Sequence, residues 1–430
     1  MNLRKISQDP YLLFLPFLII FIAIILIFKT NGLNGDEGRY FRCARNLLMG
    51  FYSPPAPDIY LPNGPGYPIF LVPFLVLRLP MVSITIMNAV FYYFSIILIY
   101  KTLQQFVSIN VTLIISFFWA CNLNAYQFLQ WALPETLSIL LISLIVFSIV
   151  KVFDTNNSSN TKKYLFLSGL LIGYLVLTKV IFGYVLLFML TGSGLLWIFN
   201  RKSINHRKGV IILLIALATN APYLVYTYHL TGKMFYWSSF GGNNLYWMTT
   251  PFKGEYGDWI YFKGIANDSI SSTNQLLSNK KSIISNHKKY FDEINKYKGV
   301  AQDDAYKRIA VNNIKSHPLK FVQNCFCNIG RMFFNFPYSC ESQSPRTLLR
   351  LPFNGILVVL FLYCLCPTFI NWRKINYPLR FLLFFALIYF CGSILGSADI
   401  RMVTVITPIL LFWIAFILNK TMIISMKLWE

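Results

Sequence analysis

The sequence predicts an all-α protein, a polytopic bundle of about ten transmembrane helices or a few more, with interfacial helices and a small external subdomain. Composition is the first reason, because the 430 residues are 56% hydrophobic and only 13% charged. Soluble domains carry about 25% charged residues. The second reason is a series of apolar runs, among them residues 11–28, 81–100 and 402–418. They approach or reach the ~20 residues that cross a bilayer.

Basic residues in the short loops indicate which way these spans run. Short cytoplasmic loops carry an excess of Lys and Arg. With the N-terminus inside, the loops that contain Lys101, Lys151, Arg201 and Arg373 all fall on the cytoplasmic side. The expected spans are residues 11–28, 81–100, 108–126, 135–151, 164–179, 180–199, 209–228, 351–371, 379–396 and 402–419.

Two further apolar stretches are expected not to cross. Residues 67–79 are too few to span and contain two prolines, which favours an interfacial piece. Residues 318–336 are interrupted by Lys320, Arg331 and several asparagines. Counting either stretch alone as a span would move every later basic loop to the wrong side of the membrane.

The spans divide the chain into three expected parts. Residues 1–228 form a transmembrane catalytic half with a first external loop at 29–80. Residues 229–350 form an external loop subdomain that lies over the membrane, and residues 351–430 form the C-terminal transmembrane helices.

Charge and cysteine usage narrow the function classes. The net charge of +22 is spread over loops and tails, which argues against nucleic acid as a partner. Eight cysteines without a CxxC pair and four separated histidines give no support for a metal site. The sequence requires no cofactor, and a divalent cation is compatible but unsupported. A disulfide between Cys340 and either Cys325 or Cys327 stays open.

The spans carry no Asp, Glu, Lys or Arg in their interiors, whereas ion-coupled transporters place such residues near the midplane. We therefore expect any chemistry at the membrane surface, and by topology at the outer one. Acids are scarce there, which draws attention to the segment directly after the first span.

That segment reads NGDEGRYFRCAR and pairs Asp36 with Glu37. Adjacent residues point in different directions on a helix, so one acid can face a cavity while the other binds backbone or a basic partner. A solvated loop acid or a helix cap is the alternative. Arg39, Arg42 and Arg45 follow at every third position and indicate an amphipathic interfacial helix. Their stripe suits either a bound phosphate or lipid headgroups.

Four other positions are candidate binding residues. Tyr67 lies in a Pro-Gly-Tyr-Pro turn at interfacial depth, and Glu135 lies where a span begins, which is also an ordinary helix start. Lys179 is a lone cation at an outer hairpin, and Arg401 lies at another outer span start. A cation in a low-dielectric setting makes a strong contact with phosphate.

The long external segment contains the sequence GGNNLYW at residues 241–247. Asn243 and Asn244 place amides beside aromatic rings, a combination that suits a carbohydrate. The same residues suit a surface turn equally well, so this stretch alone does not decide between the two.

The order of these motifs resembles the GT-C superfamily of membrane glycosyltransferases. The resemblance is to bacterial dolichyl-phosphate-mannose–protein mannosyltransferase-like proteins and lipid A aminoarabinose transferase-like proteins. It covers most of residues 1–250 and returns near residues 397–411. This chain departs from the pattern at Asn63 and Gly64, where relatives often carry Lys or Arg. One phosphate contact is then missing, or comes from an arginine elsewhere, namely Arg39, Arg42 or Arg401.

The resemblance implies a polyprenyl-phosphate-linked sugar donor and an acid that removes the proton of the acceptor hydroxyl. By motif position, that base is Asp36, with Glu37 as an orienting or second acid, and Lys179 lies near the donor phosphate. The implied substrate-binding residues are Arg39, Tyr40, Tyr67, Glu135, Lys179, Asn243, Asn244 and Arg401. The implied partners are the donor, a glycan, lipid or protein acceptor, and membrane lipids.

The resemblance also implies a bacterial inner membrane location with the active site facing the periplasm. Two other functions stay open. An O-antigen polymerase or ligase has many spans and a large outer loop, but does not need an acid pair after the first span. A polysaccharide or lipid exporter performs no covalent chemistry, and needs a polar path that charge-free spans do not readily give.

Overall fold

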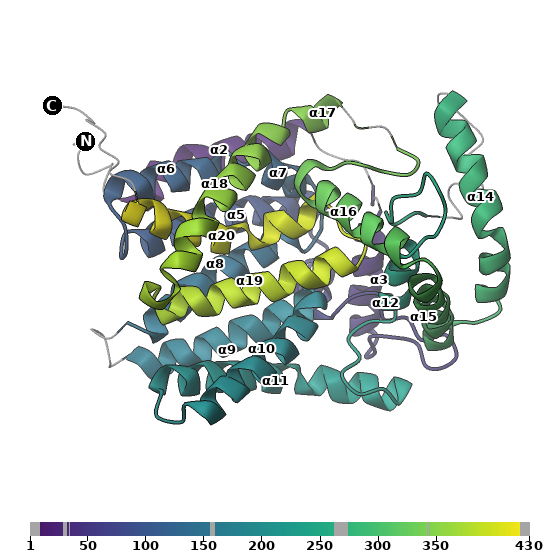
Figure 1. Cartoon of the computed structure of the whole chain (residues 1–430), viewed down its shortest axis with the longest axis horizontal. Helices are drawn as coiled ribbons and strands as arrows, with labels where there is room; N and C mark the ends of the chain where they lie inside the picture. The colour runs from purple at the N-terminus through teal and green to yellow at the C-terminus, as the bar shows by residue number, and fades with distance from the viewer. Residues whose placement is uncertain are drawn as a thin grey trace.

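The computed structural model describes residues 9–28, 32–33, 35–154, 160–261, 274–341, 343 and 345–421. Within these residues the regular structure is helical and no strand occurs. Figure 1 shows most helices running side by side in one bundle, with a smaller group beyond one end. The chain is therefore an all-α, multi-pass integral membrane protein, which confirms the predicted fold class.

Nine helical segments of the described chain are long and apolar enough to cross a membrane. Eight are single helices and one, Ile109–Gln130, joins α6, α7 and the 3₁₀ helix η1. The single helices are α2 (Pro10–Ile27), α5 (Met81–Leu103), α8 (Glu135–Val152), α10 (Ile181–Phe199), α11 (Ile204–Thr231), α18 (Leu351–Ile370), α19 (Tyr377–Leu395) and α20 (Ile400–Thr421).

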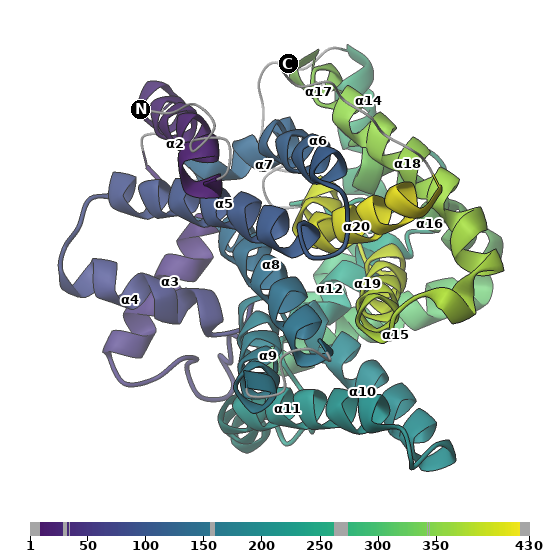
Figure 2. The same ribbon diagram turned by 90° about the vertical axis from the view of Figure 1, so that its left-hand side faces the viewer.

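The tenth predicted span, residues 164–179, forms helix α9 (Thr161–Thr178). It is not among the nine segments. It nevertheless packs against both α8 and α11, and Figure 2 shows it directly beside α11. Glycines allow this close approach, because a Cβ at Gly169 or Gly173 would come within 2.6 Å of an α11 side chain.

Helix α20 lies in the middle of the bundle. In its most apolar stretch of 18 residues, 83% of the residues are buried inside the protein, compared with 17% in the peripheral helix α2. A helix that is hydrophobic on all sides is buried on all sides, and α20 packs against α5, α8, α18 and α19. The residues at its start are consequently held in place by a rigid element.

Two short helices precede α5 and do not cross. Helix α3 (Glu37–Leu48) is amphipathic, with Tyr40, Cys43 and Ala44 buried on one side and Arg42 and Arg45 exposed on the other. Helix α4 (Gly66–Val76) is apolar but has only 11 residues. The prediction that this stretch is too short to span is confirmed, and Figure 2 shows α3 and α4 side by side.

The long segment between α11 and α18 forms a helical group at one end of the bundle (Figure 1). Its helices are α12 (Gly241–Met248), α14 (Asn274–Ile294), α15 (Gly299–Ser316), α16 (Pro318–Phe334) and α17 (Pro345–Leu348). It has a small core of its own around Tyr246, Trp247 and Phe291. Helix α16 is not among the membrane-crossing segments, as predicted. The boundaries at residues 228 and 350 stay a prediction.

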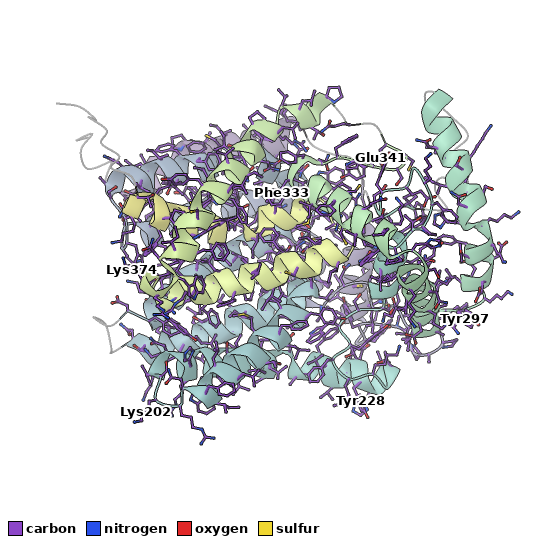
Figure 3. All side chains as sticks on the ribbon, viewed as in Figure 1. Lys202, Tyr228, Tyr297, Phe333, Glu341 and Lys374 are labelled. Carbon is purple, nitrogen blue, oxygen red and sulfur yellow. The ribbon has the colours of Figure 1, made fainter. Side chains whose placement is uncertain are left out.

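Figure 3 places Lys202 and Lys374, from two basic loops, at the end of the bundle opposite Tyr297 and Glu341. Lys374 belongs to the short helix η3 (Trp372–Lys374). This is the separation that the predicted topology requires, with basic short loops at one end and the long segment at the other. Which end faces the cytoplasm stays a prediction.

Candidate active site

Asp36 lies at the start of α3 and lines a cavity of about 360 Å³. Two arginines hold its carboxylate. Its Oδ1 accepts a hydrogen bond from Arg39 on the next turn of α3. Its Oδ2 accepts one from Nη1 of Arg401, at 2.9 Å, from the first turn of α20. The site thus joins residues that are 365 positions apart in the chain.

The two arginines decide the charge of this acid. Burial on its own raises the pKa of the Asp36 carboxyl, but the guanidinium groups of Arg401 and Arg39 outweigh burial and lower the pKa below its ordinary value of 3.8. The carboxylate is therefore ionised at neutral pH. Because folding lowers the pKa of Asp36, its ion pairs stabilise the folded protein fully at a pH above the ordinary pKa of 3.8. This stabilisation is lost as the pH falls through the lower pKa of the folded state.

Arg401 is itself fixed by a second acid. Its Nε lies 2.9 Å from Oδ2 of Asp399, and its backbone N–H donates to Oδ1 of the same residue at 2.9 Å. Bidentate contacts with carboxylate are strong and directional. The sequence analysis did not select Asp399 as a site residue. The spacing of an acid two residues before Arg401 is the signal that marks it.

The remaining cavity wall is part polar and part apolar. The polar wall includes amides from two distant segments, and the apolar wall comes mainly from the connection into α8. The lining residues are Gly35, Asp36, Gln127, Phe128, Trp131, Leu133, Asn335, Asp399, Ile400 and Arg401. Sequence reasoning did not select Gln127, Trp131 or Asn335, because each reaches the site only through tertiary packing, of α16 against α20 and of η1 against α5.

Glu37 points elsewhere. Its side chain is fully buried, and its Oε1 accepts the backbone N–H of Ala132 at 2.6 Å. This bond ties the start of α3 to the segment just before α8. The two neighbouring acids therefore differ in surroundings, since Asp36 faces the cavity and Glu37 is bound within the protein. Their chemical roles stay predictions.

Glu135 and Lys179 form a buried ion pair. Nζ of Lys179 lies 2.9 Å from Oε1 of Glu135, and the two side chains are 11% and 2% exposed respectively. Oε2 of Glu135 is also buried and has no hydrogen-bond partner among the described residues. The lone cation that the sequence assigned to a phosphate is thus held by an acid on the neighbouring helix.

Tyr40 and Tyr67 connect the two charged centres. Their rings meet edge to face, with centroids 5.2 Å apart. Burial, and then the nearby Glu135 carboxylate, raises the pKa of both phenols, and Asp36 adds to the effect on Tyr40. Both hydroxyls are therefore protonated donors at neutral pH. The Tyr67 hydroxyl is buried without a partner in the described chain.

Two of the predicted motifs touch each other. A Cβ on Gly64 would lie 2.1 Å from the carbonyl oxygen of Leu177, and one on Gly66 would lie 2.6 Å from the Thr178 hydroxyl. The Tyr174 hydroxyl also donates to the Gly66 carbonyl oxygen at 2.9 Å. The glycine turn before α4 therefore packs directly on the end of α9, where Lys179 follows.

We expect Gly64→Ala to destabilise this junction by about 1–3 kcal/mol, because the added methyl group meets backbone that cannot give way cheaply. The thermal unfolding midpoint of the purified chain in detergent measures this effect. Gly38→Ala is the matched control, since a Cβ there meets nothing within 4 Å. A Gly64→Ala midpoint equal to the wild-type value would contradict the close contact.

The three arginines of α3 have separate surroundings. Arg39 binds Asp36 and lies 5.5 Å from the ring centroid of Phe240. Arg42 lies over the ring of Tyr60 at 4.6 Å, and both Arg42 and Arg45 are exposed. The stripe is therefore not uniform. Of these three arginines, only Arg39 forms an ion pair with a cavity residue in the described chain.

Asn243 and Asn244 lie on α12, outside the cavity lining. Asn244 is exposed, whereas Oδ1 of Asn243 is buried and lacks a partner among the described residues. The aromatic residues of the same motif, Tyr246 and Trp247, belong to the small external core. The rings of this motif are thus part of a packed core, and neither amide lines the cavity at Asp36. A role of the two amides in binding stays a prediction.

All eight cysteines are free, so Cys340 pairs with neither Cys325 nor Cys327. In the part of the chain that the structure describes, no three His, Cys, Asp or Glu side chains gather closely enough to hold a metal ion.

Residues 65–226 match the protein-family model described as dolichyl-phosphate-mannose-protein mannosyltransferase. The matched region contains Gly66, Glu135 and Lys179, whereas Gly64, Asp36 and Arg401 lie outside it. Among solved structures, the chain is similar to the oligosaccharyltransferase of Archaeoglobus fulgidus with a tethered acceptor peptide, at a TM-score of 0.50 and 14% identity, over 95% of this chain and 49% of that one. The chain has the GT-C fold.

Two other solved structures are also similar. One is ArnT from Cupriavidus metallidurans bound to undecaprenyl phosphate, with a TM-score of 0.43, 11% identity and coverage of 94% of this chain and 76% of that one. The other is the Pmt1–Pmt2 complex of S. cerevisiae bound to the sugar donor. Its TM-score is 0.38 and its identity 21%, over 52% of this chain and 34% of that one. No curated protein sequence matches the chain. The chain spans about half the length of the archaeal oligosaccharyltransferase.

Proposed function

We propose that this chain is an integral membrane glycosyltransferase that moves a sugar from a polyprenyl-phosphate donor to a glycan, lipid or protein acceptor. The observation that carries the proposal is Asp36, an ionised carboxylate that lines a cavity of about 360 Å³ and is held between two arginines. The GT-C fold and the family match over residues 65–226 support the same function.

The proposed reaction is a single displacement with inversion at the anomeric carbon. The acceptor hydroxyl gives its proton to the Asp36 carboxylate while its oxygen bonds to the anomeric carbon. The bond from that carbon to the phosphate oxygen breaks, and the polyprenyl phosphate leaves with the electron pair. One base and one cation-rich site for the leaving phosphate are sufficient for this reaction.

In this mechanism Arg39 and Arg401 keep Asp36 ionised, and Arg401 also stabilises the leaving phosphate. A carboxylate held by two guanidinium groups stays ionised, but it is a weak base because its pKa is low. A donor phosphate that takes over one of Arg401's hydrogen bonds would raise the pKa of Asp36 as it binds. Donor binding would thus prepare the base, and Arg401 would already lie where negative charge develops on the leaving group.

We assign the active site to the outer face of a bacterial inner membrane, facing the periplasm. The positive-inside rule supports this orientation, since Lys202 and Lys374 lie at the end of the bundle opposite the long segment (Figure 3). Transfer of a hexosyl or pentosyl unit fits the same chemistry.

The test is to incubate membranes containing the chain with a panel of labelled polyprenyl-monophosphate sugars and to follow which label moves, and onto what. We expect one donor to give a labelled product that is absent from membranes without the chain. Transfer only from longer lipid-linked oligosaccharides would favour a polymerase or ligase. Movement of a labelled glycan across the bilayer without covalent transfer would favour an exporter, and either result would overturn the proposal.

A further inference from the structure

A buried asparagine of α16 reaches across to the segment that carries the cavity residues of α20. Asn328 is fully buried, and its Nδ2 lies 2.9, 3.1 and 2.5 Å from the carbonyl oxygens of Ser393, Ile394 and Gly396. These carbonyls lie at the end of α19, where helical carbonyls lack partners within their own helix. One side chain therefore completes the end of α19.

The same asparagine also holds the residues that follow. Its Oδ1 accepts the backbone N–H of Ala398 at 3.0 Å, one residue before Asp399. Asn328 thus binds the α19–α20 connection at two places. Its amide N–H groups donate to carbonyl oxygens up to Gly396, and its amide oxygen accepts the N–H of Ala398. The whole connection from Ser393 to Ala398 is fixed to α16 by a single amide.

Asn328 is in turn fixed by the external segment. Nη2 of Arg331, one helical turn away, donates to its Oδ1 at 3.1 Å, and Nη1 donates to the Tyr256 carbonyl oxygen at 2.7 Å. Arg331 is fully buried. A buried guanidinium with directed hydrogen bonds has little freedom to move, so it sets the amide orientation of Asn328.

These contacts form a continuous path to Asp36. Asn328 fixes the backbone at Ala398, Asp399 follows and binds the guanidinium of Arg401, and Arg401 binds Oδ2 of Asp36. Each step joins consecutive residues of the chain or is a hydrogen bond of 3.0 Å or less. Figure 1 shows α16 crossing the end of the bundle where α19 gives way to α20.

We propose that Asn328 is a positioning residue for the active site, through which the external segment sets the placement of Arg401 against Asp36. This proposal rests on the proposed function. Asn328 does not line the cavity and does not touch the reacting groups. Its effect is on the geometry of the arginine, because small displacements of a charged partner alter both its hydrogen bond and its electrostatic effect.

Asn324 provides a matched control on the same helix. It is also fully buried, and its Nδ2 also donates to two backbone carbonyls, those of Met248 and Thr250, both at 3.0 Å. Those carbonyls belong to the end of α12 and the segment after it, not to the connection before α20. Removing either amide costs buried hydrogen bonds of the same kind, but only Asn328 leads to Arg401.

The first experiment needs no activity. It compares the thermal unfolding midpoint of the full chain in detergent for Asn328→Ala, Asp36→Asn and the double variant, and repeats the cycle with Asn324→Ala. We expect the Asp36→Asn shift in midpoint to differ between wild type and Asn328→Ala, and to be unchanged by Asn324→Ala. An Asn328 cycle that is additive, or one no more coupled than the Asn324 cycle, would overturn the proposal.

The second experiment uses the pH dependence of transfer. The titratable and charged groups around Asp36 come from four elements. They are Arg39 and Tyr40 from α3, Tyr60 from the loop before α4, Asp399 from the α19–α20 connection, and Arg401 from α20. If Asn328→Ala loosens the contact with Arg401, the acid limb of the rate profile moves to higher pH by about one unit. Arg401→Gln gives the shift for complete loss of the contact.

The midpoint of that limb does not depend on how much of a variant folds. Asn328→Ser replaces Asn328→Ala in both experiments if the alanine variant does not accumulate, with the same outcomes. An acid limb that coincides with the wild type, or an equal shift in Asn324→Ala, would count against the positioning role. Absence of transfer by the wild-type chain would instead refute the proposed function, and the thermal cycle would still decide the role of Asn328.

Discussion

Asp36→Asn is expected to reduce sugar transfer by at least about 10²-fold, the lower part of the range for removal of a general base. The substitution keeps the shape of the side chain and removes the charge held between Arg39 and Arg401. Membrane insertion and abundance should stay unchanged, because the residue lies outside the membrane-crossing helices. Initial rates with the donor found in the panel measure the effect.

Asp58→Asn is the control for this variant. Asp58 is another acid of the first external loop and also forms an ion pair, with Lys298 at 3.0 Å, but its side chain is 59% exposed and lies outside the cavity lining. We expect near wild-type transfer from it, since an exposed pair contributes little. Full transfer by Asp36→Asn would remove Asp36 from the role of base.

Lys179→Met is expected to destabilise the chain by about 3–5 kcal/mol, because it leaves a buried acid without its partner. The Glu135 side chain is 2% exposed, and its second oxygen already lacks a hydrogen bond in the described chain. The thermal unfolding midpoint in detergent, with and without the substitution, measures the loss.

The double variant Glu135→Gln/Lys179→Met separates stability from donor binding. Removal of both charges should restore most of the unfolding midpoint, because no unpaired buried charge remains. If Lys179 also binds the donor phosphate, as the motif resemblance implies, the KM for the donor should be higher in this stable double variant than in the wild type. Recovery of both stability and donor KM would limit Lys179 to a structural role.

The sequence by itself determined the membrane-helical class and most of the spans. Long apolar runs without charge have one stable arrangement in a bilayer, since their backbone groups must be satisfied within each helix. It also determined the amphipathic character of α3, because apolar and basic residues alternate with a helical period over only twelve residues. Such properties are local, and local patterns are readable from a single sequence.

The sequence also selected Asp36, Arg401, Glu135 and Lys179, but as separate positions. It could not place the amides of Asn243 and Asn244, which lie outside the cavity lining, since a motif of amides and rings looks the same in a binding site and in a packed external core. It gave no indication of Asn328, which reads as one more polar interruption of an apolar stretch.

Only the tertiary structure decided which charges meet. Asp36 and Arg401 are 365 positions apart, and Glu135 and Lys179 are 44 apart. Their contacts exist because α20 is packed in the centre of the bundle and α9 is packed against α8. A cation lowers the pKa of a carboxyl group strongly only when it lies within about 4–6 Å. The ionisation of Asp36, and with it the proposed chemistry, therefore depends on packing that no local pattern in the sequence encodes.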